Sequence, residues 1–240
     1  MSPEPLSHRE KRALQATVQR YMASCDGLRA HCERCLQTRR WEGQVPLMLV
    51  DAAFMSIGLN YFTSVVPAVA KYEEWMNEGR APGSLRELSA LSYEHLAPLW
   101  KNRRSWQVAR DVAACMADDS ISDTSALRRW AADASVRSWK SNRVGMVRGV
   151  GINTFQYLRM MGGVDTSMPD KIVRRVIADV LREADVVLPT AGDLELIYTI
   201  DHIAEATGYR PIELCWMTWM VQSEGKVMRM AKYRDLLGRI

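Results

Sequence analysis

The sequence predicts an all-α protein, on three observations. Apolar residues recur at helical spacing along most of the chain, and no segment shows the apolar–polar alternation of a half-buried strand. Gly and Pro residues separate these segments, and no internal repeat is present. The length of 240 residues, 48% of them hydrophobic, allows one large domain or two smaller lobes with a substantial core.

The composition is that of an ordinary globular protein with a slight basic excess. Lys and Arg number 32 against 28 Asp and Glu, and the net charge of +4 permits an anionic partner without requiring one. No apolar run approaches the ~20 residues that span a bilayer. The first residues lack the apolar core of a signal peptide. We therefore expect a cytoplasmic protein without a membrane partner.

Residues 6–40 are expected to form one or two polar helices, with Leu14 and Val18 facing inward. Cys25, Cys32 and Cys35 have the spacing C-x6-C-x2-C, which invites a metal or cluster interpretation. A fourth ligand is missing nearby, so we favour buried thiols and predict neither a metal nor a cofactor. The odd total of five cysteines argues against a disulfide framework.

A central helix is expected next, because Leu47 to Met55 is apolar apart from Asp51 and Pro46 suits a helix start. Asp51 is either a buried polar anchor, which we favour, or a functional carboxylate. After Gly58 a further helix is expected over residues 64–77.

In the middle of the chain, the spacing of apolar residues predicts four shorter helices. They cover residues 84–91, 92–99, 104–117 and 124–131. The basic cluster from Lys101 to Arg104 is ordinarily a solvated helix end, and it could also contact phosphate. Beyond Pro189 two helices are expected, over 191–206 and from Pro211 onward. A final helix would carry Lys226, Arg229, Lys232, Arg234 and Arg239.

Residues 135–147 have helical spacing, and Phe155, Leu158 and Met161 indicate another short helix. Gly149-Val150-Gly151 joins the two, which predicts a helix-hairpin-helix motif over residues 135–163. The glycines accept backbone conformations that other residues avoid, and the second helix directs its unpaired N–H groups outward. Such a helix start binds one phosphate without reading sequence. Arg148 adds positive charge nearby. Many helix connections contain Gly-x-Gly, so a plain connection is the alternative.

Asp170 is the second candidate for function. We expect Ser167 to be the N-cap, with Met168 and Pro169 opening a helix that has Asp170 in its first turn. The helix N-terminus should then lower the pKa of the Asp170 carboxyl. An ionised carboxylate can stabilise a positively charged, sugar-like transition state or orient a water. On helix chemistry alone we favour the plainer interpretation, that Asp170 is no more than a good first-turn residue.

The stretch from Gly149 to Gly163, followed by Met168-Pro169-Asp170-Lys171-Ile172-Val173-Arg174-Arg175, resembles the helix-hairpin-helix DNA glycosylase superfamily. The resemblance is specific over about residues 140–180 and loose elsewhere. It implies a two-lobed helical glycosylase fold, with lobes at 1–40 plus 185–240 and at 41–184. It also implies that Asp170 is the catalytic carboxylate and that the hairpin holds duplex DNA. The backbone-binding residues would be Lys140, Arg143, Arg148, Gly149, Val150, Gly151 and Asn153.

The implied activity is monofunctional, because Asn153 stands where bifunctional members carry a lysine. Lys171 is a poor substitute, since its side chain should diverge from Asp170 on the helix. The iron–sulfur cysteines of some members are absent from the C-terminal half, where only Cys215 lies. A flipped base would be lined by Ser56, Gly58, Asn60, Tyr61, Trp216 and Trp219. We expect a monomer.

Three functions follow from these observations. The leading one is base removal by water, from a repair lesion or from a modified base in foreign (phage) DNA. The others are a non-catalytic DNA-binding module and an all-α protein-interaction domain whose Gly-Val-Gly is only a connection. The polar wedge residue of the glycosylase family is not evident, because Gly58 and Asn60 occupy its neighbourhood.

Overall fold

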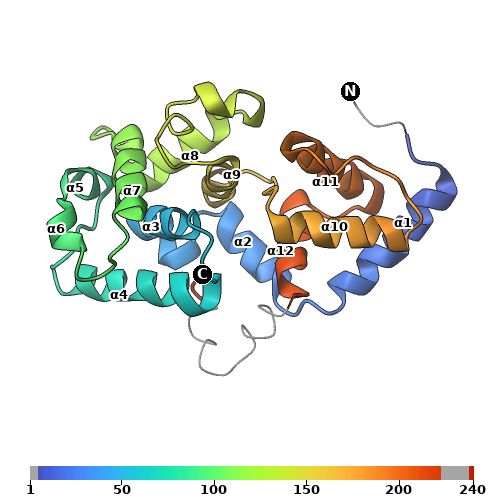
Figure 1. The fold of residues 1–240 in the computed structure, drawn as a ribbon, viewed down its shortest axis with the longest axis horizontal. Coiled ribbons are helices and arrows are strands. Elements are labelled where there is room, and N and C mark those ends of the chain that lie inside the picture. Colours follow the sequence, from blue (N-terminus) through green and yellow to red (C-terminus); the bar gives the residue numbers. More distant parts are fainter. Residues whose placement is uncertain (1–4, 223–237) are drawn as a thin grey trace. The chain divides into compact units, whose positions relative to one another are not determined.

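The computed structural model describes residues 5–222 and 238–240 (Figure 1). All regular structure in these residues is helical, and no strand occurs among them. The all-α prediction is therefore confirmed. None of the helices in this part of the chain has the length and apolar character that crossing a bilayer requires. The predicted final helix lies outside the described residues, apart from Arg239.

Contacts divide the chain into two compact units. Within the described residues the first unit contains 5–33, 165–222 and Gly238, and the second contains 34–164 and 239–240. The expected lobe boundaries were 40/41 and 184/185, so residues 165–184 group with the chain's ends instead of its middle. This segment contains α10 (Lys171–Glu183), whose apolar face packs against α1 and α12. Periodicity predicts such a face but not its partner.

The first unit is built from long helices with clear sequence signals. Its helices are α1 (His8–Met22), the start of α2 (Leu28–Leu36), α10, α11 (Asp193–Thr207) and α12 (Pro211–Met220). Ser7 and Glu10 form a capping box at the start of α1. Gly208 ends α11 in the left-handed conformation, with φ of 77°. α12 has almost all its residues buried and packs against α10 and α11.

The second unit surrounds α3 with shorter helices. Its elements are α3 (Val45–Met55), α4 (Val66–Asn77), α5 (Leu85–Ala90), α6 (Tyr93–Leu96), α7 (Arg103–Met116), α8 (Asp123–Asp133), α9 (Ile152–Met161), the 3-10 helices η1 (Arg40–Gly43) and η3 (Val136–Ser141), and the short π-helix η2 (Tyr61–Val65). Residues 45–54 are all buried. Apart from Asp51, α3 is apolar all round, and it packs against α4, α7 and α9 (Figure 1).

Asp51 is the polar centre of this core. Its Oδ2 accepts hydrogen bonds from Trp41 Nε1 at 2.8 Å, from Tyr61 Oη at 2.9 Å, and from Arg40 Nη2 and Tyr157 Oη at 3.2 Å. Burial raises the pKa of both tyrosines, so their hydroxyls stay protonated and donate. Asp51 and Arg40 are fully buried. These contacts support the interpretation of Asp51 as a structural anchor.

The predicted α-helix over residues 135–147 was wrong. This segment contains only the short helix η3, which is kinked at Ser138. A series of turns follows it as far as Val150. The Asn142 side chain accepts from Trp130 Nε1 at 3.1 Å and from Val144 N at 3.0 Å. Such local bonds compete with helical ones. An α-helix therefore lies only on the C-terminal side of the glycine hairpin, where α9 begins.

The cysteines are reduced, and four of the five are buried. Cys32 lies in the first unit, where its thiol donates to the Ile212 carbonyl at 3.8 Å. Cys35 lies in the second unit, where it accepts from Arg40 Nη1 at 4.0 Å. Among the described residues no group of three or more His, Cys, Asp and Glu side chains is arranged to hold a metal.

Candidate functional site

Asp170 is itself the N-cap of α10. Its Oδ1 accepts from the main-chain N–H groups of Ile172 at 2.7 Å and Val173 at 2.8 Å. Its backbone is extended, with φ of −76° and ψ of 172°, as a capping residue requires. Both bonds fall on Oδ1, which leaves Oδ2 outside the cap. The carboxylate is therefore held in one orientation by the main chain.

The expected cap at Ser167 was wrong, because residues 164–170 are not helical. Two bonds to α12 and its start keep the segment extended. Asp165 Oδ1 accepts from Ile212 N at 3.0 Å, and Met168 N donates to Cys215 Sγ at 3.4 Å. Ser167 is buried. The helix can therefore begin only where the segment leaves this anchorage, at Asp170.

The pKa of the Asp170 carboxyl is raised, which contradicts the expected lowering. Burial has the largest effect and disfavours the charged form. The N–H groups of Val173 and Ile172, the Trp219 indole and the charge of Lys171 act in the opposite direction, in that order. The helix start does stabilise the anion, as the sequence indicated. The sequence did not show how far this carboxyl is withdrawn from water.

Trp219 is the predicted base-pocket residue that the structure brings to Asp170. Its indole N–H is near enough to lower the pKa of that carboxyl. The N–H is buried, and it makes no hydrogen bond of normal geometry to a described residue. The site in the first unit therefore combines a fixed carboxylate, that of Asp170, with an aromatic ring, that of Trp219. Arg174 is not part of it, since it ties down the main chain at Pro169 and at residues 190–192.

The other predicted base-pocket residues are less accessible or lie in the second unit. Trp216 is 3% exposed and meets His31 edge to face, with ring centroids 4.3 Å apart. Tyr61 is 2% exposed, and its hydroxyl belongs to the Asp51 network. Burial therefore removes both rings from contact with a flipped base in this conformation. They were predicted because stacking on an aromatic ring suits a flipped base, and the sequence does not show which rings are buried.

The loop after α3 contains the remaining three, Ser56, Gly58 and Asn60. Gly58 and Asn60 are exposed, and Asn60 accepts from Thr63 N at 2.9 Å to cap the following turn. Between them lies Leu59, a large apolar side chain that is 41% exposed. The sequence prediction did not include Leu59, because a polar wedge residue was expected at this position.

The glycine hairpin lies in the second unit. Gly149 has φ of 103°, and a Cβ there would lie 2.8 Å from Val108 Cγ2 and 3.3 Å from Arg104 Nε. Gly151 is the exposed N-cap of α9 and has no side chain to bond the first N–H groups. The first N–H groups of α9 therefore receive no side-chain cap from Gly151.

The charged residues predicted around the hairpin are on the surface of the same unit. Lys140, Arg143 and Arg148 are exposed. Val150 is 8% exposed, so only its main chain is available to a ligand. Asn153 has its Oδ1 buried without a hydrogen-bond partner in the described part of the chain.

We expect Gly149→Ala to destabilise the second unit by about 1–3 kcal/mol, because it adds a left-handed strain and a clash with Val108. Gly151→Ala is the matched control. Its φ is −103°, and nothing lies within 4 Å of the added Cβ. Urea unfolding followed by circular dichroism measures both. Equal stability of the two variants would contradict the close packing of the hairpin on α7.

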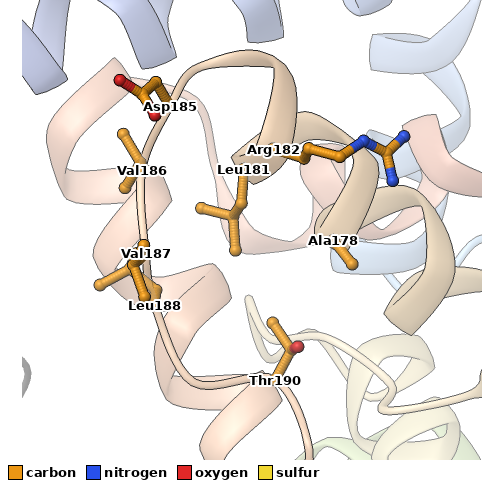
Figure 2. A pocket seen from close by; sticks show the side chains of 8 residues that line it. All are labelled: Ala178, Leu181, Arg182, Asp185, Val186, Val187, Leu188 and Thr190. Carbon is orange, nitrogen blue, oxygen red and sulfur yellow. The ribbon is translucent and has the colours of Figure 1, made fainter.

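A hollow of about 370 Å³ lies in the first unit beyond the middle of α10 (Figure 2). Its lining is mostly aliphatic and includes Leu181, Val186 and Leu188, with the 95% exposed Val187 at its edge. The lining residue of α10 nearest in sequence to Asp170 is Ala178. These positions differ by eight residues, or ~12 Å along the helix. The hollow is therefore separate from the environment of Asp170.

The fold and site define an all-α protein with a helix-capping carboxylate in one helical unit and a glycine hairpin in the other. Residues 19–223 match the family described as Domain of unknown function (DUF8548), and the chain belongs to this family. No curated protein and no solved structure matches it.

Proposed function

We propose that this protein is a monofunctional DNA glycosylase, acting in the cytoplasm as a monomer. It flips a damaged or modified base out of duplex DNA and hydrolyses the N-glycosidic bond, leaving an abasic site. Flipping is needed because the bond is inaccessible in the base stack. The observation that carries the proposal is Asp170, a carboxylate fixed by two main-chain N–H groups and with a raised pKa.

Asp170 is the catalytic residue in this proposal. The bond from C1′ to the base nitrogen breaks, and its electron pair leaves with the base. The sugar gains positive charge, which the carboxylate stabilises. A water oxygen then bonds to C1′ and gives its proton to Asp170. A raised pKa suits this last role, because it makes the ionised carboxylate a stronger base.

The hairpin binds the DNA backbone in this proposal. The open N–H groups at the start of α9 would accept one backbone phosphate, since Gly151 leaves them uncapped and no Cβ blocks the approach. Such contacts position the duplex without reading its sequence. Such binding suits an enzyme that recognises one altered base and not a particular DNA sequence.

Two apolar side chains suit the flipped state. Trp219, beside Asp170, offers a ring on which an extruded base can stack. The exposed Leu59 is the side chain that we assign to the space left in the duplex, because apolar wedges commonly fill a disrupted base step.

We expect no covalent intermediate, because Asn153 cannot form a Schiff base and Lys171 is exposed one position beyond the cap. Sodium borohydride should therefore fail to trap the protein on DNA under conditions in which base release is complete. The measurement is a denaturing gel of the borohydride reaction, with a known bifunctional glycosylase as the positive control. A trapped band that disappears in Lys171→Ala would contradict the monofunctional mechanism.

The base itself is identified by mass spectrometry of what the protein releases from duplexes. The panel should hold alkylated purines, oxidised guanine and enzymatically modified phage bases. Release of one class, with an abasic site left in the strand, supports the proposal. Salt-dependent DNA binding without release from any duplex would instead favour a non-catalytic module.

A further inference from the structure

A second group of basic side chains lies on the second unit beside the hairpin. It is a hollow of about 490 Å³ lined by Arg103, Arg104 and Gln107 of α7 and by Arg148 of the hairpin. Arg104 and Arg148 are 44 positions apart in the sequence. Folding therefore assembles a concave basic surface that no single stretch of the chain contains.

The arginines of this hollow lack an acidic partner within the described part of the chain. All three are exposed, and none forms an ion pair with an acidic side chain of the described residues. Arg103 lies over the Tyr93 ring, 5.2 Å from its centroid. The carboxylate of Asp111 is held by Gln107 Nε2 at 2.7 Å. Three like charges that converge without a counter-charge repel one another, so an anion in the hollow is favoured.

The hollow is built on rigid elements. Asn102 caps α7 by accepting from Ser105 N at 3.0 Å, and the buried Trp106 donates to the Trp100 carbonyl at 2.8 Å. These contacts fix the helix turn that carries Arg103 and Arg104. On the other side, Gly149 lacks a Cβ and so lies directly against Arg104. Arg103 and Arg104 are therefore displayed on a well-anchored helix, and Arg148 lies in the turn of the hairpin that packs against it.

We propose that this hollow binds a second backbone phosphate of duplex DNA, apart from the one at the start of α9. The inference rests on the proposed function for its choice of DNA as the partner. The planar guanidinium forks of Arg103, Arg104 and Arg148 match the paired oxygens of a phosphodiester. The volume admits the phosphate together with its sugar. The DNA contact surface thus extends from the hairpin main chain onto α7.

The test is the salt dependence of duplex binding by Arg103→Gln/Arg104→Gln. Loss of one phosphate contact should make the slope of log K against log salt shallower by about 1. Affinity should fall by the same factor for duplexes of unrelated sequence. Both residues are exposed and glutamine is a good helix former, so the fold should be kept; circular dichroism checks this. Fluorescence anisotropy of labelled 20-base-pair duplexes gives the constants.

Lys71→Gln/Arg12→Gln is the matched control, because it removes the same charge from exposed positions on α4 and α1. Its slope should stay within about 0.3 of the wild-type value. An equal change in both double variants would overturn the proposal, since a general loss of charge would then explain it. An unchanged slope in Arg103→Gln/Arg104→Gln would also overturn it.

Two further outcomes separate this inference from the proposed function. If the wild-type protein shows no salt-dependent duplex binding, DNA is not the partner and both fail. If the slope changes as expected but no base is released from any duplex, the phosphate site stands and the glycosylase activity fails. Mononucleotide binding is measured for the same variants. If Arg103→Gln/Arg104→Gln loses mononucleotide binding but keeps the wild-type duplex slope, the hollow binds a small phosphate ligand, which overturns the DNA assignment.

Discussion

Asp170→Asn should lower the rate of base release by about 100-fold or more while leaving duplex binding within a factor of about two. Asparagine cannot accept a proton from water or stabilise a positive sugar with a full charge, and losses of this size follow the removal of one electrostatic group from an active site. Single-turnover release at saturating protein measures chemistry, and anisotropy measures binding. Unchanged release would remove Asp170 from the mechanism.

The same substitution should leave the protein as stable or more stable at neutral pH. Asparagine caps a helix as well as aspartate does, so the bonds to Ile172 and Val173 are retained. The raised pKa means that the folded protein favours protonated Asp170. Its contribution to stability is therefore fully present below the unfolded-state pKa and is lost as pH rises through the folded-state pKa. Asp170→Asn should remove this loss. Lower activity with undiminished stability is typical of a catalytic residue.

Base release by the wild-type protein should fall as pH drops through the pKa of Asp170. Because burial raises that pKa, the decline should begin at a higher pH than for an ordinary aspartate.

Asp51→Ala should destabilise the second unit by about 3–5 kcal/mol. The substitution leaves the fully buried Arg40 charge without its partner and removes the acceptor of Trp41, Tyr61 and Tyr157. Trp41 itself has φ of 50°, a strained conformation that the network helps to hold. Urea unfolding monitored by tryptophan fluorescence gives the free energy of unfolding.

Tyr157→Phe is the control for Asp51→Ala, since it removes one hydroxyl and keeps the ion pair. It should cost only about 1 kcal/mol. If Asp51→Ala proves too unstable to purify, Asp51→Asn is the milder variant and should fall between the two. A loss in Asp51→Ala no larger than in Tyr157→Phe would contradict the role of Asp51 as the anchor of this core.

Much of the fold could be predicted because helix signals are local. Pro46 and Pro211 lie at helix starts, Gly208 at a helix end, and the apolar run after Pro46 became the buried centre of the second unit. The helix predicted over 135–147 failed for a local reason too, since Asn142 offers the backbone other hydrogen bonds.

Fewer properties of the candidate site than of the fold could be predicted from the sequence. The sequence by itself determined that Asp170 lies at a helix start and that Gly149 and Gly151 precede another, because capping and backbone freedom depend on neighbouring residues. Only the tertiary structure decided the sign of the Asp170 pKa shift, which burial controls. It also decided that Tyr61 and Trp216 are covered while Leu59 is exposed, and that Arg148 lines the same hollow as Arg103 and Arg104. Burial and convergence depend on residues far away in the chain, which spacing along a sequence does not specify.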